Sequence, residues 1–157
     1  PGGAPPRGAA PPQAEDPEVN NLRDAARYGD VEAVEDFLAI GKDAGEADEM
    51  GRTALHYAVT FGKPPHGGEI MRLLLEEGAP LSAVDKKGNT PLHYAAGYGK
   101  PEAVVELVEA GASTAAKNDE GQTPADVARL NAQNPCVQNA EVMRRLEEGA
   151  DAFFADQ

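Results

Sequence analysis

The sequence predicts an all-α solenoid in which short helix–turn–helix repeats stack side by side. Two blocks of residues recur in the same order, and the glycines that open successive copies of the first block, Gly88 and Gly121, are 33 residues apart. The first block reads GRTALHYAVTFGK at 51–63, GNTPLHYAAGYGK at 88–100 and GQTPADVARLNAQ at 121–133. The second reads LLLEEGAP at 73–80, ELVEAGAS at 106–113 and RLEEGADA at 145–152. Such a repeat cannot bury its apolar face alone, so neighbours must stack to form a core.

The motif T-P-L-H-x-A at this period is typical of ankyrin repeats, in which a β-hairpin finger precedes two helices. Glycine in each finger turn supplies the positive φ that the turn needs. The predicted N-caps of the first helices are Thr53, Thr90 and Thr123. The second helices are expected at 31–40, 69–77, 102–110 and 141–148, each followed or closed by glycine.

A Pro-, Gly- and Ala-rich segment at 1–17 is expected to be a disordered linker before a repeat domain at 18–157. Within this domain the repeats are expected at about 19–47, 48–80, 81–113 and 114–149, with a C-terminal cap at 150–157.

Repeat four departs from the motif and is predicted to close the solenoid. It carries Asp126 where histidine is expected, and its loop containing Pro135 and Cys136 is longer than in the other repeats. Phe153 and Phe154 are expected to fold over its open end, because a terminal repeat must cover its exposed apolar face. The alternative is that they form a free apolar tip for a partner.

Composition limits the possible partners. Acidic residues outnumber basic ones by 27 to 14, and the net charge is −13. A nucleic-acid partner needs a basic surface, so this class is not expected. A single cysteine cannot form an internal disulfide, which favours a reducing, cytoplasmic environment. No apolar run approaches the ~18 residues that would span a membrane.

Two histidines invite a catalytic or metal-binding interpretation. His56 and His93 occupy the same repeat position, so they should lie about 10 Å apart on neighbouring helices, too far to share a metal. We expect each to bond to the backbone of the next finger. The sequence offers no nucleophile with a nearby base and no metal set, so it predicts a protein that is not an enzyme and needs no cofactor.

Aligning the ends of the first helices brings three aromatic residues, Tyr28, Phe61 and Tyr98, to one repeat position. Lys63 and Lys100 follow two residues after the second and third of them. Such an amphipathic strip could bind a lipid headgroup and the start of its acyl chains, or an apolar segment of a protein. The alternative is simple packing between repeats.

Charge is expected to divide the surface. The second helices carry twelve of the 27 acidic residues and only three arginines, which predicts an acidic convex face. The basic residues of the fingers and first helices are Arg23, Arg27, Arg52, Lys63, Lys86, Lys87, Lys100, Lys117 and Arg129. An ordinary solvated surface is the alternative interpretation.

Beyond the general repeat pattern, HYAAGYG at 93–99 and DAFF at 151–154 make the chain resemble the ankyrin domain of plant and algal ankyrin-repeat targeting factors over about 19–154. These factors are cytosolic chaperones for proteins of the chloroplast outer envelope. The resemblance implies a domain that docks peripherally on that membrane by binding monogalactosyldiacylglycerol and phosphatidylglycerol. It also implies that client proteins bind a region upstream of the domain.

The resemblance places the phosphatidylglycerol site at Tyr98 and Lys100, with lysine in place of the arginine of the plant proteins. It places the galactolipid site at Glu46 and, where the family has a histidine, at Arg23. We extend the lipid surface to Tyr28, Phe61 and Lys63. The alternative function is a general protein-interaction scaffold, whose fingers and concave face would bind a peptide, a ribosomal protein or a co-chaperone.

Overall fold

The computed structural model describes residues 18–62 and 66–149, and within these ranges it contains eight α-helices. They are α1 (Leu22–Tyr28), α2 (Val31–Ala39), α3 (Ala54–Phe61), α4 (Gly67–Glu76), α5 (Pro91–Gly97), α6 (Pro101–Glu109), α7 (Pro124–Arg129) and α8 (Ala140–Glu148). The predicted second helices are all present, with ends within two residues of the expected positions. Of these helices, none is long and apolar enough to cross a bilayer.

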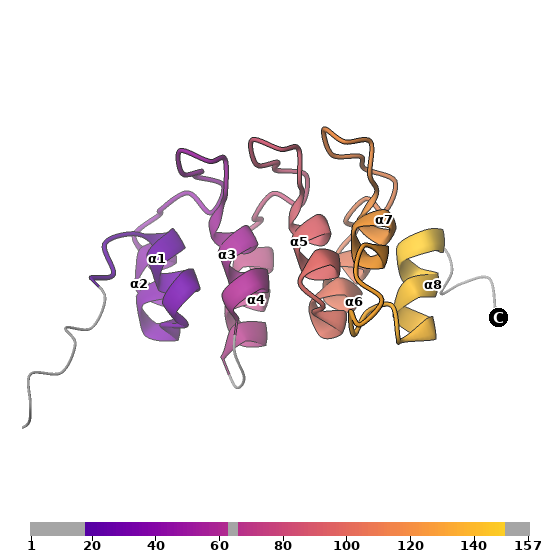
Figure 1. Ribbon diagram of the computed structural model, residues 1–157. Helices are drawn as coiled ribbons and strands as arrows, with labels where there is room; N and C mark the ends of the chain where they lie inside the picture. Colours follow the sequence, from indigo (N-terminus) through magenta and orange to yellow (C-terminus); the bar gives the residue numbers. More distant parts are fainter. Residues whose placement is uncertain (1–17, 63–65, 150–157) are drawn as a thin grey trace, which may run out of the picture.

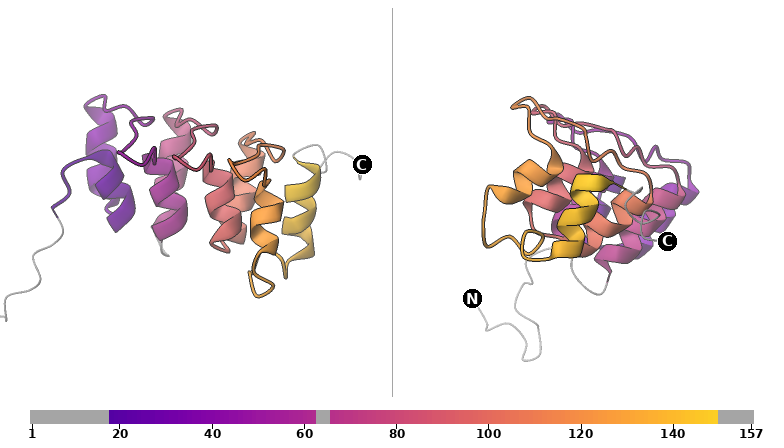
Figure 2. Two further views of the ribbon diagram at one scale, coloured as in Figure 1. Left: turned by 45° about the horizontal axis from the view of Figure 1, so that its top comes forward. Right: turned by 90° about the vertical axis from the view of Figure 1, so that its right-hand side faces the viewer.

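The helices form two parallel rows. The A helices α1, α3, α5 and α7 make one row and the B helices α2, α4, α6 and α8 the other, while three fingers project from the same edge (Figures 1 and 2). Each A helix packs on the next A helix and on the B helix of its own repeat. The predicted four-repeat ankyrin solenoid is confirmed.

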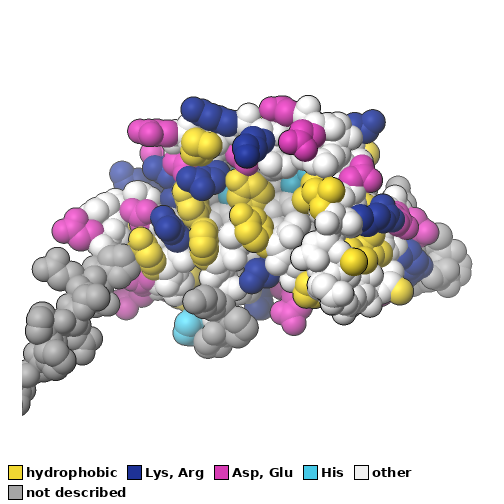
Figure 3. Space-filling model, in the orientation of Figure 1, with side chains coloured by type: hydrophobic (Ala, Val, Ile, Leu, Met, Phe, Trp, Pro, Cys, Tyr) yellow, Lys and Arg dark blue, Asp and Glu magenta, His cyan; other side chains and the backbone are white. Residues whose placement is uncertain are grey.

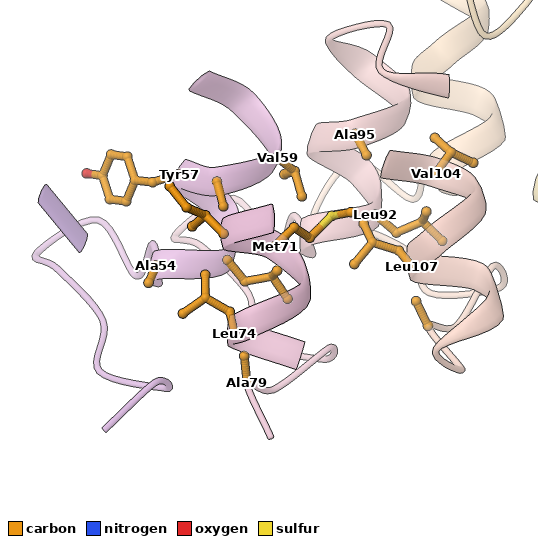
Figure 4. Packing of buried hydrophobic residues seen from close by; sticks show 14 of the residues in the cluster. Ala54, Tyr57, Val59, Met71, Leu74, Ala79, Leu92, Ala95, Val104 and Leu107 are labelled. Atoms are coloured by element: carbon orange, nitrogen blue, oxygen red, sulfur yellow. The ribbon is translucent and has the colours of Figure 1, made fainter. Parts of the chain in front are cut away.

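Leucines at equivalent positions of successive repeats fill the space between the two rows. Leu55 and Leu92 come from A helices, Leu74 and Leu107 from B helices, and all four are fully buried. Figure 4 shows this layer, with Met71 of α4 reaching toward α5. Truncating such a leucine to alanine costs about 2–5 kcal/mol of folding stability, so this layer of leucines is a main source of stability.

Capping boxes begin three of the A helices. In α5, the backbone N–H of His93 donates to Thr90 Oγ1 (3.3 Å), and the N–H of Thr90 donates to His93 Nδ1 (3.1 Å). In α7, Asp126 takes the place of the histidine and accepts the N–H of Thr123 at 3.1 Å. The unusual Asp126 therefore keeps the cap.

The fingers differ from the prediction, since no strand is found in the described residues. Each finger is a tight turn whose first residue donates its backbone N–H to the carbonyl of its last residue. In the middle finger, for example, the N–H of Asp85 donates to the carbonyl of Asn89 at 3.1 Å. Gly88, inside this turn, has φ +78°. Arms this short cannot build the ladder that defines a β-hairpin. Neighbouring fingers are joined instead by individual backbone hydrogen bonds, such as the one that the N–H of Lys86 donates to the Met50 carbonyl at 2.9 Å.

The long loop of repeat four is part of the folded body. Asn134 is buried, and its side-chain amide donates to the carbonyl of Ala96 in α5 at 2.7 Å. Cys136 is also buried, and burial raises the pKa of its thiol to about 11. The loop therefore ties repeat four to repeat three. The predicted linker at 1–17 and the cap at 150–157, with Phe153 and Phe154, lie outside the described residues.

Candidate functional site

The surface formed by α1, α3, α5 and α7, here called the A-helix face, carries the predicted aromatic strip. Tyr28, Phe61 and Tyr98 are 48%, 43% and 62% exposed, so all three rings are open to solvent. Figure 3 views this face and shows hydrophobic side chains over the A helices, with Lys and Arg side chains among and above them. In repeat four the strip ends, because Asn131 takes the aromatic position.

Two tyrosines, the buried Tyr57 and the half-buried Tyr94, support the strip from behind. Tyr57 stacks on Phe61 with ring centroids 6.2 Å apart, and Tyr94 meets Tyr98 edge to face at 5.9 Å. The hydroxyl of Tyr94 donates to Asp85 at 2.6 Å, and that of Tyr57 donates in the same way to Asp48. Burial, followed by the bond to Asp85, raises the pKa of Tyr94. The strip is therefore held by rings that are fixed to the fingers.

Arg27 links repeats one and two across the strip. Its guanidinium carbon lies 5.6 Å from the ring centroid of Tyr28 and 5.3 Å from that of Phe61. Both distances are within the range of cation–π attraction. This role was missed from the sequence, although Arg27 immediately precedes the aligned aromatic position. Packing between repeats therefore accounts for part of the strip, while its outer surface stays exposed.

The two residues of the predicted phosphatidylglycerol site sit on either side of a turn. Tyr98 follows α5, Gly99 turns the chain with φ +69°, and Lys100 is the residue before α6. The two side chains line different hollows. Tyr98 lines a groove between the fingers, and Lys100 lines a hollow of about 400 Å³ between the second and third repeats. Lys63 lies outside the described residues.

The predicted galactolipid pair is in contact. Arg23 Nη1 lies 3.4 Å from the carboxylate of Glu46 and donates to its backbone carbonyl at 3.3 Å. The residues are 23 positions apart in the chain, so the contact comes from the fold. The Arg23 side chain is 18% exposed and that of Glu46 is 61% exposed, which leaves mainly the carboxylate open to a ligand.

A groove between the fingers of repeats two and three, here called the finger groove, has a volume of about 400 Å³. Its walls include Met50, Arg52, Lys86, Lys87, Tyr98 and Val127. Lys86 and Lys87 are exposed, and neither forms an ion pair with another described residue. The sequence analysis named these cations but did not identify the groove. The signal was the finger DKKGN, which is basic where its neighbours DEMGR and NDEGQ are acidic.

Both buried histidines have the predicted structural role. His56 Nε2 lies 3.0 Å from the carbonyl oxygen of Asn89, and His93 Nε2 lies 2.9 Å from that of Gln122. Burial lowers the pKa of each imidazole, so both stay neutral at pH 7. Among the described side chains, no group of three or more His, Cys, Asp or Glu could hold a metal ion.

The opposite face is acidic, as predicted. Exposed carboxylates on the B helices include Glu32, Glu35, Glu76, Glu102 and Glu109. Two arginines of α8 are paired there: Arg144 contacts Glu141, and Arg145 contacts both Glu109 and Glu141, all at 3.1 Å. Arg72 of α4 instead donates to the Gly68 carbonyl at 3.1 Å. Arg129 of α7, one of the basic residues listed for the first helices, is paired with Glu147. Within the described ranges, Arg27, Lys86, Lys87, Lys100 and Lys117 form no ion pair with another described residue.

Comparison with known proteins agrees with this architecture. A family model described as ankyrin repeats, three copies, matches residues 22–118 and 65–151. Human diacylglycerol kinase zeta (Homo sapiens) is 42% identical over 118 residues, which is 74% of this chain and 12% of that protein. The chain thus spans about an eighth of its relative, and the kinase activity in that name belongs to the whole human protein. The repeats, the capping boxes and the family match together show that the chain belongs to the ankyrin-repeat family.

Proposed function

We propose that this chain is a non-enzymatic docking domain that places a targeting factor on the chloroplast outer envelope through its A-helix face. One observation carries the proposal: exposed aromatic rings lie beside Arg27, Lys86 and Lys87 on the A-helix face, and none of these three cations forms an ion pair with a described residue. The exposed carboxylates of the B helices lie on the other face. An anionic lipid surface would attract the first face and repel the second. The domain would then bind in one orientation.

Phosphatidylglycerol is the proposed ligand of Tyr98 and Lys100. The lysine ammonium can approach the phosphate from the turn after α5, while the exposed ring of Tyr98 covers the glycerol and the first acyl carbons. Lysine supplies a point charge rather than the two-pronged contact of arginine, so we expect weaker geometric selection of the headgroup. The resemblance to targeting factors is the source of this assignment, and the exposure of Tyr98 supports it.

Monogalactosyldiacylglycerol is the proposed ligand of Glu46 and Arg23. The exposed carboxylate of Glu46 can accept hydrogen bonds from sugar hydroxyls, and Arg23 holds it in place from α1. The rest of the strip, Tyr28 and Phe61 with Lys63, would extend the lipid surface toward repeat one. Client proteins would bind a separate upstream region, as the resemblance implies.

Flotation with liposomes tests this function. The chain is mixed with vesicles of phosphatidylcholine alone, with added galactolipid, or with added galactolipid and phosphatidylglycerol. We expect flotation with the last mixture and its loss in Tyr98→Ala/Lys100→Ala. The control is Ile40→Ala/Lys42→Ala, since Ile40-Gly41-Lys42 after α2 has the same spacing and Ile40 is 71% exposed. Equal flotation of both double variants, or none of the wild type, would contradict the proposal.

A second function, a protein-interaction scaffold, is what ankyrin repeats in general suggest. The finger groove favours it, because a hollow lined by Lys86, Lys87 and Tyr98 suits a protein segment better than a flat surface. The two functions are compatible, since a targeting factor must bind its target membrane and also protein partners such as a ribosomal protein or a co-chaperone. Pull-down of partners with and without Lys86→Glu/Lys87→Glu separates this function from lipid docking.

A further inference from the structure

We propose that the finger groove binds an acidic peptide segment that carries an aromatic side chain. The inference rests on the second proposed function, protein binding, and not on lipid docking. The groove lies between the fingers of repeats two and three and has room, at about 400 Å³, for one or two large side chains. Its recognition chemistry follows from the charges on its rim and the rings in its wall.

The rim attracts anions. Lys86 and Lys87 are exposed at the tip of the middle finger, and within the described chain no carboxylate forms an ion pair with either. Asp85 also lines the groove, but its carboxylate is already engaged: it accepts the hydroxyl of Tyr94 at 2.6 Å and two backbone N–H groups at 2.9 Å. The one carboxylate of the described groove lining is therefore already engaged by three hydrogen-bond donors, whereas neither lysine forms an ion pair with a described residue.

The wall offers an apolar surface beside this charge. Tyr98 is 62% exposed and Met50 is 43% exposed, and both line the groove. The ring of Tyr98 is held edge to face by Tyr94, so an aromatic side chain from a partner would meet a surface that is already ordered. Preordered rings lose little entropy on binding and commonly act as anchors in interfaces.

The neighbouring fingers favour a narrow partner over a membrane. The N–H of Lys86 donates to the Met50 carbonyl, and the N–H of Asp119 donates to the Lys87 carbonyl, both at 2.9 Å. These bonds hold the three tips side by side, so exposed Glu49 flanks the lysines on one side and Asp119 on the other. A flat anionic surface would meet the acids together with the lysines. A single peptide strand can enter between them.

The test uses the whole chain and a fluorescein-labelled peptide, DEDEFDEDE, with anisotropy as the readout. We expect Lys86→Glu/Lys87→Glu to weaken binding by about tenfold or more, because two attractions become repulsions. Lys42→Glu/Lys117→Glu makes the same change of net charge outside the groove and should leave affinity within about twofold. All four lysines are exposed, so folding is preserved, which circular dichroism verifies. Raising the salt concentration should weaken binding of the wild type.

A second comparison tests the aromatic anchor. Tyr98→Ala should weaken binding of DEDEFDEDE several-fold and leave the weaker binding of DEDEADEDE unchanged. The proposal is overturned if the peptide does not bind, if both lysine double variants weaken it equally, or if Tyr98→Ala affects the two peptides alike. It is also overturned if Lys86→Glu/Lys87→Glu abolishes vesicle flotation while the peptide does not bind, since the groove would then be a membrane contact. Peptide binding without flotation would reject lipid docking alone.

Discussion

The imidazole Nε2 of His56 lies 3.0 Å from the backbone carbonyl oxygen of Asn89, which is 33 residues away and belongs to the next finger. At its other nitrogen, His56 accepts the N–H of Thr53 at 3.1 Å. One side chain therefore caps its own helix and fixes the neighbouring finger. The same arrangement recurs from His93 to Gln122, so buried histidines position the fingers of repeats three and four.

Replacing His56 with alanine should lower the free energy of unfolding by about 2–4 kcal/mol, because it leaves a cavity and an unpaired carbonyl at Asn89. Urea denaturation followed by circular dichroism measures the loss. His66 is exposed at the start of α4, so His66→Ala is the control and should cost less than about 0.5 kcal/mol. Equal losses in the two variants would refute the assigned role of His56.

Stability should fall as the solution becomes more acidic than the ordinary histidine pKa of 6.5. Burial lowers the pKa values of His56 and His93 in the folded state, so below 6.5 the unfolded chain binds protons that the folded chain does not. The stability that the two neutral imidazoles contribute is fully present above pH 6.5 and is lost as the pH falls toward their pKa values in the folded state. Asp48 and Asp85, whose pKa values lie below 3.8, stay charged in this window.

The measurement is the urea midpoint at pH 7.5 and at pH 5.5. The wild type should have the lower midpoint at pH 5.5, and His93→Gln should show a smaller difference between the two pH values. A midpoint independent of pH, or a difference unchanged in His93→Gln, would show that these imidazoles do not titrate differently on unfolding.

Two finger glycines should respond differently to alanine. Gly88 and Gly121 have φ of +78° and +73°, so both variants incur the cost of a left-handed backbone, about 1 kcal/mol. A Cβ at Gly88 would also lie 2.7 Å from Asp119 Oδ1 and 2.9 Å from its backbone nitrogen, whereas none of the described atoms lies within 4 Å at Gly121. Thermal or urea unfolding should therefore show the larger loss for Gly88→Ala. The reverse order would mean that the fingers do not touch as described.

Asn134→Ala should destabilise the chain by about 2–3 kcal/mol, because the buried amide bonds the Ala96 carbonyl and accepts the N–H of Cys136 at 2.8 Å. Gln138, exposed in the same loop, provides the control, and its replacement by alanine should have little effect. Chemical denaturation of the two variants compares them directly. If Asn134→Ala were as stable as Gln138→Ala, the loop would not anchor repeat four.

Much of the fold could be predicted because the helix boundaries of ankyrin repeats are specified by residues close together in the sequence. Thr90, Pro91 and His93 specify the start of α5 within four residues, and the spacing to the next copy sets the stacking. The predicted β-hairpins did not form, since that prediction came from the family description and the finger arms are too short for a ladder.

The site was only partly predictable. Exposure of Tyr98 follows from its repeat position, whereas the contact between Arg23 and Glu46 depends on how repeat one turns back on α1. The place of Arg27 between two rings depends on the packing of adjacent repeats, which no local pattern encodes. The finger groove likewise depends on how two fingers pack beside Tyr98 and Val127, so its lysines were visible in the sequence and its shape was not.

The most direct test of lipid docking uses the absence of tryptophan from this chain, which makes an introduced indole a unique fluorescent reporter. Tyr98→Trp places it on the strip, and Ile40→Trp places it at an exposed site after α2. With vesicles of galactolipid and phosphatidylglycerol, emission from Trp at position 98 should shift to shorter wavelength and be quenched by brominated acyl chains, while emission from position 40 stays unchanged. An unchanged spectrum at position 98 under conditions where the protein floats, or equal shifts at both positions, would contradict docking through the A-helix face.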